Sequence, residues 1–411
     1  MTTAAIVFLG TAIAFVLLQS ILIFQYNRVL KQTSGRVGSD HPTSVAMILC
    51  VRGFDPSLTN CLLALTQQDY SLKKLIIVGD HVTDPGMIAA KQFLEKQNSL
   101  EFQILINDQI HKSCSLKCSN LVYACQRLDD QIDVIALVDA DSNPPQDWLQ
   151  MMVSPFKDHE VAVTTGIRWF IPTGPLSGTL VRYIWNTAAI VQMVCYRIPW
   201  GGSLAIRTSY IRETELLEYW SNGFCEDTML DTICNKDKKK IAIVADAIIP
   251  SDEQTEFATC IPWISRQLLT TRLHHPKWPL VLGHGLLTGT LSFGSLLLAI
   301  TCVVIQSHVA AMLFAGTYVL IQAGNALLLN WIESPIARKD RSLTTRIGLA
   351  RFLLGIFLTQ TCYCTAILKT VFARTVSWRQ IDYQIGSHSV EPVGYQPYQQ
   401  LEIDNKQSSS L

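Results

Sequence analysis

Charged side chains are scarce in this chain of 411 residues, where Asp, Glu, Lys and Arg make up 16% of the sequence. The scarcity is local, because residues 4–24 carry no charge and residues 278–332 contain no Asp, Glu, Lys or Arg. About 20 apolar residues suffice to cross a hydrocarbon core of about 30 Å. We therefore expect a transmembrane anchor within residues 1–27 and two spans within residues 279–332. A shorter apolar segment within residues 344–372 predicts a third span or a re-entrant helix.

Neither sign of charge is in excess, since 33 basic residues balance 33 acidic ones, and this argues against a nucleic-acid partner. The absence of Asp, Glu, Lys and Arg from the two later spans argues against a transporter, because substrate pathways usually carry an ionisable residue. Basic residues lie instead at the ends of the apolar stretches, which the positive-inside rule places in the cytoplasm. They are Arg28, Lys31, Arg36, Arg266, Arg272, Lys277, Arg338, Lys339, Arg341 and Arg346. We expect a multi-pass protein of a bacterial inner membrane, or of a Golgi or endoplasmic reticulum membrane.

The twelve cysteines form no C-x-x-C pair, which excludes the usual sequence signature of a zinc site or a redox motif. Scattered cysteines in apolar runs are typical of buried thiols in a reducing compartment. The first span lacks a basic n-region and an A-x-A site, so we interpret it as an uncleaved anchor. Residues 386–411 are polar with little periodicity, and we expect them to be disordered.

Between the apolar stretches, short β-type runs alternate with helical stretches. This alternation predicts βαβ units and a mainly parallel sheet, in one cytoplasmic α/β domain over residues 40–250. The predicted strands are Val45–Val51, Leu75–Val78, Phe102–Ile106, Val134–Val138, Val161–Ile167 and Ile241–Ala245. The predicted helices are Pro56–Gln68, Gly86–Gln97, Ser115–Leu128 and Gln146–Pro155. Residues 251–278 end in Trp263–Trp278, whose aromatic ends and basic residues indicate amphipathic helices at the membrane interface.

The most informative motif is Asp139-Ala140-Asp141, which directly follows the apolar run Ile132–Val138. Carboxyl ends of parallel strands are where open α/β sheets bind ligands. Two carboxylates one residue apart can hold a divalent cation, Mg²⁺ or Mn²⁺, against a diphosphate. The plain alternative is a loop with two solvated acids, which for an isolated pair is the commoner case. Several further motifs near strand ends favour the ligand site.

These further motifs contain basic residues, an amide side chain, a pair of glycines and acidic residues. The turn at Arg52 leads into a helix N-terminus, whose free N–H groups favour anions. Lys117 can neutralise a phosphate, and Asn120 can bond a base or a ribose. Paired glycines allow close approach of a ligand to the backbone, although a plain turn explains them equally well. The whole set in chain order is Arg52, Asp80, Lys117, Asn120, Trp200, Gly201, Gly202, Ser203, Glu226 and Asp227.

With these residues in place, the chain resembles the inverting, membrane-integrated family 2 glycosyltransferases, and most closely the ceramide glucosyltransferase type and bacterial lipid glycosyltransferases. The resemblance runs from about Ser44 to Lys277 and implies a GT-A-like, Rossmann-type domain that binds a nucleotide sugar. It implies that Asp80 reads the uracil and that Arg52, Lys117 and Asn120 bind the UDP-sugar. It also implies that Asp139 and Asp141 hold the metal and the diphosphate.

On the acceptor side, the resemblance implies that the Trp200–Ser203 run lies near the sugar and the acceptor. It also implies that Asp227 of the Glu226-Asp227 pair is the general base, and like-charge repulsion from Glu226 would raise the pKa of Asp227. The family signature (Q/R)-x-x-R-W is degenerate here. Arg266-Gln267 keeps its first position, and Arg272 is the candidate for the missing charge.

The expected function is therefore transfer of a hexose, glucose by resemblance, from a UDP-sugar to a hydroxyl of a membrane lipid that is ceramide-like or glycerolipid-like. A processive polysaccharide synthase is the first alternative, although a polymer channel usually needs more spans than the sequence predicts. A non-catalytic membrane scaffold with a nucleotide-binding domain is the second. The sequence does not indicate an oligomeric state.

Overall fold

The core of the protein is a seven-stranded sheet with the order β3-β2-β1-β4-β6-β5-β7. The structure is a computed structural model that describes residues 1–33, 43–97 and 100–398. All neighbouring strands are parallel except β6, which runs antiparallel to both β4 and β5. The strands are β1 Val45–Cys50, β2 Lys74–Gly79, β3 Phe102–Ile106, β4 Val134–Val138, β5 Val161–Phe170, β6 Ser203–Arg207 and β7 Lys240–Ser251. The predicted mainly parallel α/β sheet is confirmed.

Helices cover both faces of the sheet. Alternate strand residues, such as Met47 and Ile48, therefore pack into two different apolar cores, one on each face. One face packs on α2, α3 and α5, and the other packs on α4, α7, α8 and α9. These helices are α2 Leu58–Thr66, α3 Pro85–Leu94, α4 Leu116–Cys125, α5 Trp148–Val153, α7 Thr208–Glu213, α8 Leu216–Ser221 and α9 Leu230–Lys236, with a 3-10 turn at Ser154–Lys157 after α5. The four predicted helices correspond to α2, α3, α4 and α5.

Four helical segments of the described chain are long and apolar enough to cross a membrane. They are α1 Thr2–Thr33, the run Trp278–Val304, α13 His308–Lys339 and α14 Leu349–Phe372. The second is continuous through α11 Trp278–Gly289, a π-helical stretch at Thr290–Gly294 and α12 Ser295–Val304. Large apolar side chains such as Leu17, Leu297 and Leu327 are more than half exposed on these helices, as expected for surfaces that face lipid.

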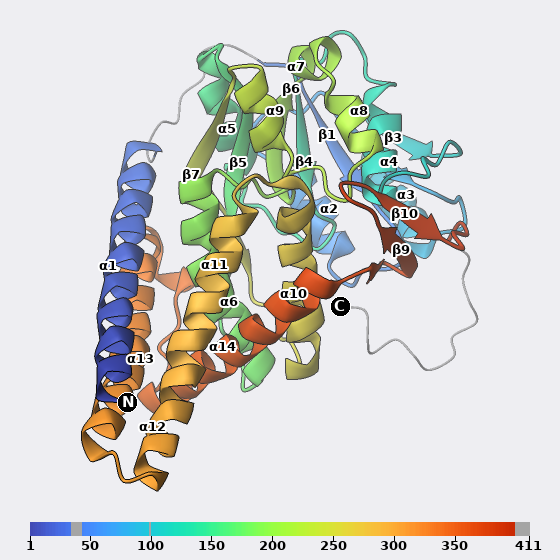
Figure 1. Cartoon of the computed structure of the whole chain (residues 1–411). Helices are drawn as coiled ribbons and strands as arrows, with labels where there is room; N and C mark the ends of the chain where they lie inside the picture. Colours follow the sequence, from blue (N-terminus) through green and yellow to red (C-terminus); the bar gives the residue numbers. More distant parts are fainter. Residues whose placement is uncertain (34–42, 98–99, 399–411) are drawn as a thin grey trace.

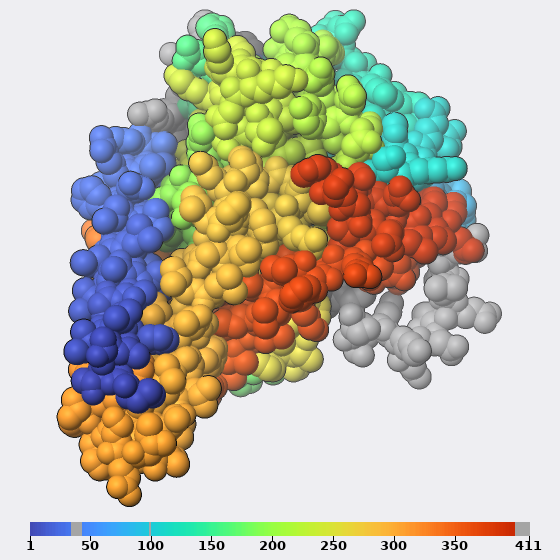
Figure 2. Space-filling model, in the orientation of Figure 1, coloured from blue at the N-terminus to red at the C-terminus, as the bar shows by residue number. Residues whose placement is uncertain are grey.

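The membrane-length helices α1, α12 and α13 form a column that projects from the α/β domain (Figures 1 and 2). α1 packs along α13, and the apolar groups between them include Phe15, Ile321 and Leu328. The C-terminal end of α13 reaches the sheet, where Lys339 pairs with Asp246 of β7 at 3.0 Å. The basic ends of α1 and α13 thus lie on the side of the α/β domain.

Three helices join the domain to this column. α6 Ser177–Tyr196 was not predicted, and it packs against α1, α10, α13 and α14. α10 Phe257–His274 occupies most of the predicted interfacial segment, residues 251–278. The first residue of that segment, Ser251, is instead the last residue of β7. α14 Leu349–Phe372 occupies most of the predicted apolar segment 344–372 and runs obliquely beneath the domain (Figure 1).

The expected disorder from residue 386 onward is wrong for residues 386–398, which have a defined structure. β10 Val390–Val393 pairs antiparallel with β9 Ile381–Ile385, which pairs with β8 Thr375–Trp378. Val390 is fully buried against Tyr383 and Phe224, so a few apolar residues order a segment whose composition is polar. Residues 399–411 of the predicted tail lie outside the described part of the chain.

Candidate active site

A cavity of about 340 Å³ lies where β1 and β4 end, and we call it the sheet-edge cavity. The loop after β1, the start of α4, the loop after β4, the glycine pair and the acidic pair all contribute to its wall. Of the predicted site residues, the wall includes Arg52, Lys117, Asn120, Asp139, Asp141, Trp200, Gly201, Gly202, Glu226, Asp227, Arg266 and Gln267. The structure therefore brings together motifs that are far apart in the sequence.

Opposite charges alternate around the sheet-edge cavity. The Lys117 ammonium lies between two carboxylates, 2.7 Å from Asp139 and 2.6 Å from Glu226. Burial opposes the charge of Lys117, but Asp139 and Glu226 outweigh it and raise the pKa of Lys117 well above its usual value. Asp141 pairs with Arg168 at 3.1 Å. Burial opposes the charge of Asp141 as well, but Arg168 holds the pKa of Asp141 below its usual value. Asp141 and Arg168 are therefore both ionised at neutral pH.

Asp139 and Asp141 are suited to a divalent cation that a substrate brings with it. Their side chains are 27% and 32% exposed, so carboxylate oxygens face the cavity. In the described residues no group of three or more His, Cys, Asp and Glu side chains is placed to hold a metal ion alone. Mg²⁺ usually binds through one or two carboxylates together with substrate phosphates and water. The two aspartates fit that arrangement.

Asp227 is buried, and backbone amides hold its carboxylate in place. The Gly201 N–H donates to one oxygen at 2.7 Å, and the Thr228 N–H and the Cys225 thiol donate to the other at 2.5 and 2.6 Å. Burial, followed by repulsion from Glu226, raises the pKa of Asp227 to about 6. A carboxylate with that pKa is a stronger base than an exposed aspartate and is still ionised at neutral pH.

The glycine pair is required by close packing against these carboxylates. A Cβ atom on Gly201 would overlap the Glu226 carboxylate and lie 3.2 Å from Asp227. A Cβ atom on Gly202 would lie 2.5 Å from an Asp139 oxygen and would also overlap Trp200. The plain-turn interpretation of the pair is therefore incomplete, because the glycines let two acidic motifs approach the same backbone.

We predict that Gly201→Ala lowers the rate of the reaction at this site by about 10²-fold, because misplacing a catalytic group by about 1 Å can cost that much. The added methyl group would displace Glu226 and shift Asp227, which is bonded to the same backbone. The measurement compares initial rates of the variant and the wild type. Gly316→Ala in α13 is the matched control, since its Cβ would meet nothing within 4 Å, and a variant at Gly201 with full activity would contradict the prediction.

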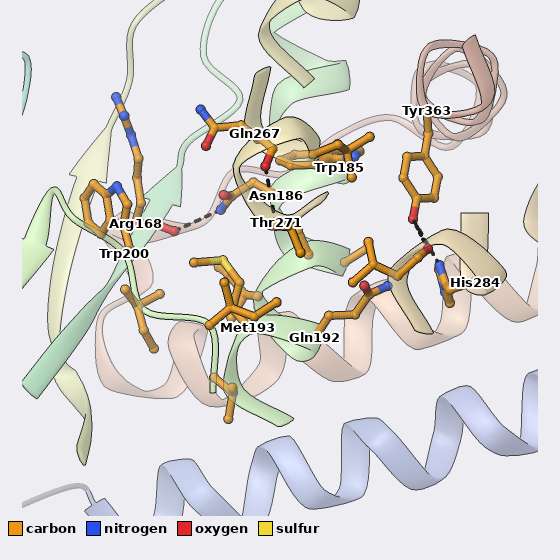
Figure 3. A pocket seen from close by; sticks show the side chains of 18 of the residues that line it. Arg168, Trp185, Asn186, Gln192, Met193, Trp200, Gln267, Thr271, His284 and Tyr363 are labelled. Atoms are coloured by element: carbon orange, nitrogen blue, oxygen red, sulfur yellow. Dashed lines mark hydrogen bonds between the residues drawn. The ribbon is translucent and has the colours of Figure 1, made fainter. Parts of the chain in front are cut away.

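A second cavity, of about 200 Å³, extends from the active-site residues between the helices, and we call it the helix cavity (Figure 3). Arg168 and Trp200 lie at one end, and His284 and Tyr363 lie at the other, with Gln267, Asn186 and Thr271 between them. Six residues line both cavities, namely Arg168, Trp200, Asp227, Trp263, Gln267 and Thr270. Asp227 is the only carboxylate in this set.

Three predicted site residues line neither cavity. Asp80 is buried at the end of β2, where it pairs with Arg52, so it reaches the sheet-edge cavity only through that partner. Ser203 is buried in β6 and accepts a hydrogen bond from Trp148 Nε1 at 2.8 Å, which is a structural contact. Arg272 donates to the Thr370 and Ala373 carbonyl oxygens at the end of α14, so it caps that helix.

The C-terminal segment covers Asp80 and Arg52. The Tyr395 hydroxyl donates to Asp80 at 3.0 Å, and the Arg52 guanidinium donates to the Arg379 and Gln396 carbonyl oxygens. Arg379 also pairs with Asp55 at 2.9 Å. The reasoning from sequence did not assign Arg168 or Arg379 to the site, although Arg168 directly follows a predicted strand and could have been found there.

The sequence model of glycosyl transferase family 21 matches residues 7–390 of the chain. This match, over most of the length, shows that the protein is a glycosyltransferase. The chain belongs to glycosyl transferase family 21, and the resemblance to the ceramide glucosyltransferase type is confirmed. No curated protein matches the chain.

Solved structures similar to the chain include a mannosyltransferase from Pyrobaculum calidifontis in complex with GDP-mannose and Mn²⁺. It is 15% identical, the match covers 89% of this chain and 99% of that chain, and the TM-score is 0.47. Another is GalNAc-T7 with UDP, GalNAc and Mn²⁺, at 11% identity, 52% and 44% coverage and a TM-score of 0.38.

Proposed function

We propose that the protein transfers a hexose from a UDP-sugar to a hydroxyl of a membrane lipid, with inversion at the sugar carbon. The observation that carries the proposal is the position of Asp227, whose side chain lines both cavities. A base in that position can take a proton from an acceptor in the helix cavity while a donor occupies the sheet-edge cavity. The sugar is glucose by resemblance to the family named above.

The charges of the sheet-edge cavity support a diphosphate donor. Arg266 lines it from α10, Arg168 from β5 and Lys117 from α4. Asp139 and Asp141 would hold a divalent cation, Mn²⁺ or Mg²⁺, which when bound neutralises the diphosphate. Asn120 Oδ1 already accepts a hydrogen bond from Asn107 at 3.0 Å, so its remaining polar atoms are the ones available to a nucleoside.

The helix cavity supports a lipid acceptor. Its wall is mainly apolar, and it includes residues of α1, α11, α13 and α14, the helices of membrane length. An acyl chain can lie between such helices while its head group reaches Trp200 and Asp227. A soluble sugar acceptor would gain little from this wall, because burying its hydroxyls against apolar side chains is costly.

In the proposed reaction, the acceptor hydroxyl attacks the sugar carbon as the bond from that carbon to the diphosphate breaks. Asp227 accepts the hydroxyl proton during the attack, a contribution that is typically worth about 10²–10⁴ in rate. Lys117, Arg168 and Arg266 stabilise the negative charge that develops on the departing nucleoside diphosphate. Glu226 keeps the pKa of Asp227 raised and holds Lys117 toward Asp139.

We propose a topology in which α1, the run Trp278–Val304 and α13 cross the membrane and α14 does not. Both flanks of α14 contact the α/β domain, since Arg351 donates to the Gly174 carbonyl at 2.6 Å and Trp378 packs on Phe224. This places the basic tail on the same side as the domain, in agreement with the charge rule. The catalytic domain would face the cytoplasm, at a bacterial inner membrane or a Golgi or endoplasmic reticulum membrane.

The rate should fall on the acid side with a midpoint near pH 6, because Asp227 must be ionised to accept a proton and its pKa is about 6. Glu226→Gln removes one of the two causes of that raised pKa, so the acid limb of kcat/KM should move to lower pH. The measurement is the pH profile of kcat/KM for both proteins. Glu95→Gln, at the exposed residue that follows α3, is the control, and an unmoved acid limb in Glu226→Gln would refute this assignment.

The direct test of the proposed function uses the purified full chain in lipid nanodiscs, labelled UDP-glucose, UDP-galactose and GDP-mannose, and a total lipid extract. We expect a glycolipid product, identified by mass spectrometry, from a UDP-sugar in the presence of Mn²⁺ or Mg²⁺. A product that lengthens with time into a polymer would favour a processive synthase. Tight UDP binding with no product from any donor would favour the non-catalytic scaffold.

A further inference from the structure

The hairpin formed by β8 and β9 contributes to the wall of the sheet-edge cavity, although it follows α14 near the C-terminal end of the described chain (Figure 1). The hairpin residues that line the cavity are Trp378, Arg379, Ile381 and Tyr383. Trp378 and Tyr383 both pack edge-on against Phe224. The Tyr383 hydroxyl also accepts a hydrogen bond from the Leu116 N–H at 3.2 Å. The hairpin is thus fixed to the start of α4 and to the loop that carries the acidic pair.

The turn of this hairpin has a backbone conformation that its two residues disfavour. Arg379 and Gln380, which separate the two strands, have φ angles of 48° and 61°. Turns of two residues with positive φ angles usually contain Asn-Gly or Asp-Gly, because larger side chains are strained there. A residue that keeps its side chain at a costly backbone position is a candidate for a functional role of that side chain.

Among the described residues, no partner uses all the hydrogen-bond donors of the Arg379 guanidinium. Its Nη2 donates to Asp55 at 2.9 Å, which occupies one of the five N–H donors that a guanidinium carries. The side chain is 36% exposed and lines the cavity, so other donors are accessible to a ligand there. Burial opposes the charge of Asp141, but Arg168 and then Arg379 lower the pKa of Asp141. The Arg379 charge therefore acts on a carboxylate that is expected to hold the metal.

Arg266 in α10 is a second cation beside the hairpin. It has no ion pair among the described residues, whereas the other five cations that line the sheet-edge cavity each pair with a carboxylate. Its guanidinium carbon lies 5.5 Å from the centroid of the Trp378 ring. Burial, followed by repulsion from Arg379, lowers the pKa of Arg266 to about 10, so Arg266 is still charged at neutral pH. Two guanidinium groups that repel each other beside one cavity are suited to an anion with several charged oxygens.

We propose that Arg379 binds the diphosphate of the donor together with Arg266, and that Trp378 is a positioning residue that holds the Arg266 guanidinium in place. The diphosphate then supplies the negative charge that Arg266 lacks. During transfer, Arg379 stabilises the charge that develops on the departing nucleoside diphosphate. The inference rests on the proposed function, because it takes the sheet-edge cavity as the donor site.

The alternative role of Arg379 is structural, as a tether between the hairpin and the loop after β1 through Asp55. The two roles predict different effects of two substitutions. Arg379→Asn removes the guanidinium but places in the turn a residue that tolerates a positive φ, so the hairpin should be retained. Asp55→Asn breaks the ion pair but leaves the guanidinium in the cavity.

The test is calorimetric titration of the full chain in nanodiscs with UDP in the presence of Mn²⁺. We expect Arg379→Asn to raise the Kd for UDP by about tenfold or more, the usual effect of losing a hydrogen bond to a charged group. Arg379→Lys keeps the charge but not the paired donors, so it should raise the Kd by less than Arg379→Asn does. The Kd of Asp55→Asn should not rise. The Tm of each ligand-free variant reports whether the fold is retained.

Gln380→Gly is the matched control, because it changes the same turn at a residue that does not line the cavity. Its Kd for UDP should equal that of the wild type. An unchanged Kd in Arg379→Asn overturns the inference. An equal rise in Asp55→Asn or in Gln380→Gly also overturns it, since the effect would then come from the tether or the turn.

The outcomes separate this inference from the proposed function. If the wild type glycosylates lipid and Arg379→Asn binds UDP normally, the inference fails and the proposed function stands. If the wild type binds UDP through Arg379 but forms no glycolipid, the proposed function fails and the diphosphate site stands. A wild type that binds no UDP contradicts both.

Discussion

Asp227→Asn should lower glycosyl transfer by about 10²–10⁴-fold, which is the usual contribution of a general base. The amide has almost the same shape as the carboxylate, and its oxygen can still accept from the Gly201 N–H, so the fold should be retained although the Thr228 N–H loses its acceptor. The dissociation constant for UDP should change little, because Lys117, Asp139 and Asp141 are untouched. The measurements are turnover with a UDP-sugar and lipid, and calorimetric titration with UDP in the presence of Mn²⁺.

Asp130→Asn is the matched control for this experiment, since the Asp130 side chain is fully exposed on the surface of the domain. It should keep full activity. If Asp227→Asn turned over as fast as the wild type, Asp227 could not be the base. If it lost UDP binding as well as turnover, its effect would be structural and the assigned role would be wrong.

Asp141→Asn should lower transfer by about 10²-fold or more, because a bound cation can contribute several kcal/mol of charge stabilisation to a departing diphosphate. The concentration of Mn²⁺ needed for half-maximal rate should rise at the same time. Chelation should abolish the activity of the wild type, and added Mn²⁺ or Mg²⁺ should restore it. The measurement is the initial rate across a metal titration for both proteins.

Asp147→Asn provides the comparison, because Asp147 lies six residues further along, is exposed and lines neither cavity. Its metal dependence should match that of the wild type. Arg168 pairs with Asp141, so Asp141→Asn also leaves the Arg168 guanidinium without its carboxylate partner. A variant that lost activity with an unchanged metal requirement would show that Asp141 acts through Arg168 rather than through a metal.

The sequence predicted the parallel part of the sheet well, because buried strands such as Val134–Val138 are apolar runs that end abruptly at polar motifs. The same logic brought Lys117 and Asp139 to one edge, since loops after parallel strands meet there, whereas Asp227 was assigned to the site only by resemblance. It did not predict α6 or β6. α6 packs against four helices and β5, so its buried residues are spread around the helix, and nothing local indicates that β6 runs antiparallel.

The positions that sequence reasoning misplaced depend on long-range contacts. Arg272 was expected to replace a lost active-site charge, yet its guanidinium reaches the carbonyls of α14, about a hundred residues further along the chain. Ser203 belongs to the glycine-rich loop in sequence but points to Trp148. His284 was not assigned to a cavity, although an ionisable residue inside an apolar stretch is itself a signal.

The most direct test is an experimental structure of the full chain in a nanodisc, bound to UDP, Mn²⁺ and a lipid acceptor. UDP should occupy the sheet-edge cavity with its diphosphate at Asp139 and Asp141. The lipid should occupy the helix cavity with a hydroxyl within about 3 Å of the Asp227 carboxylate, the distance that proton transfer requires. A lipid bound elsewhere, or a hydroxyl held away from Asp227, would contradict the account.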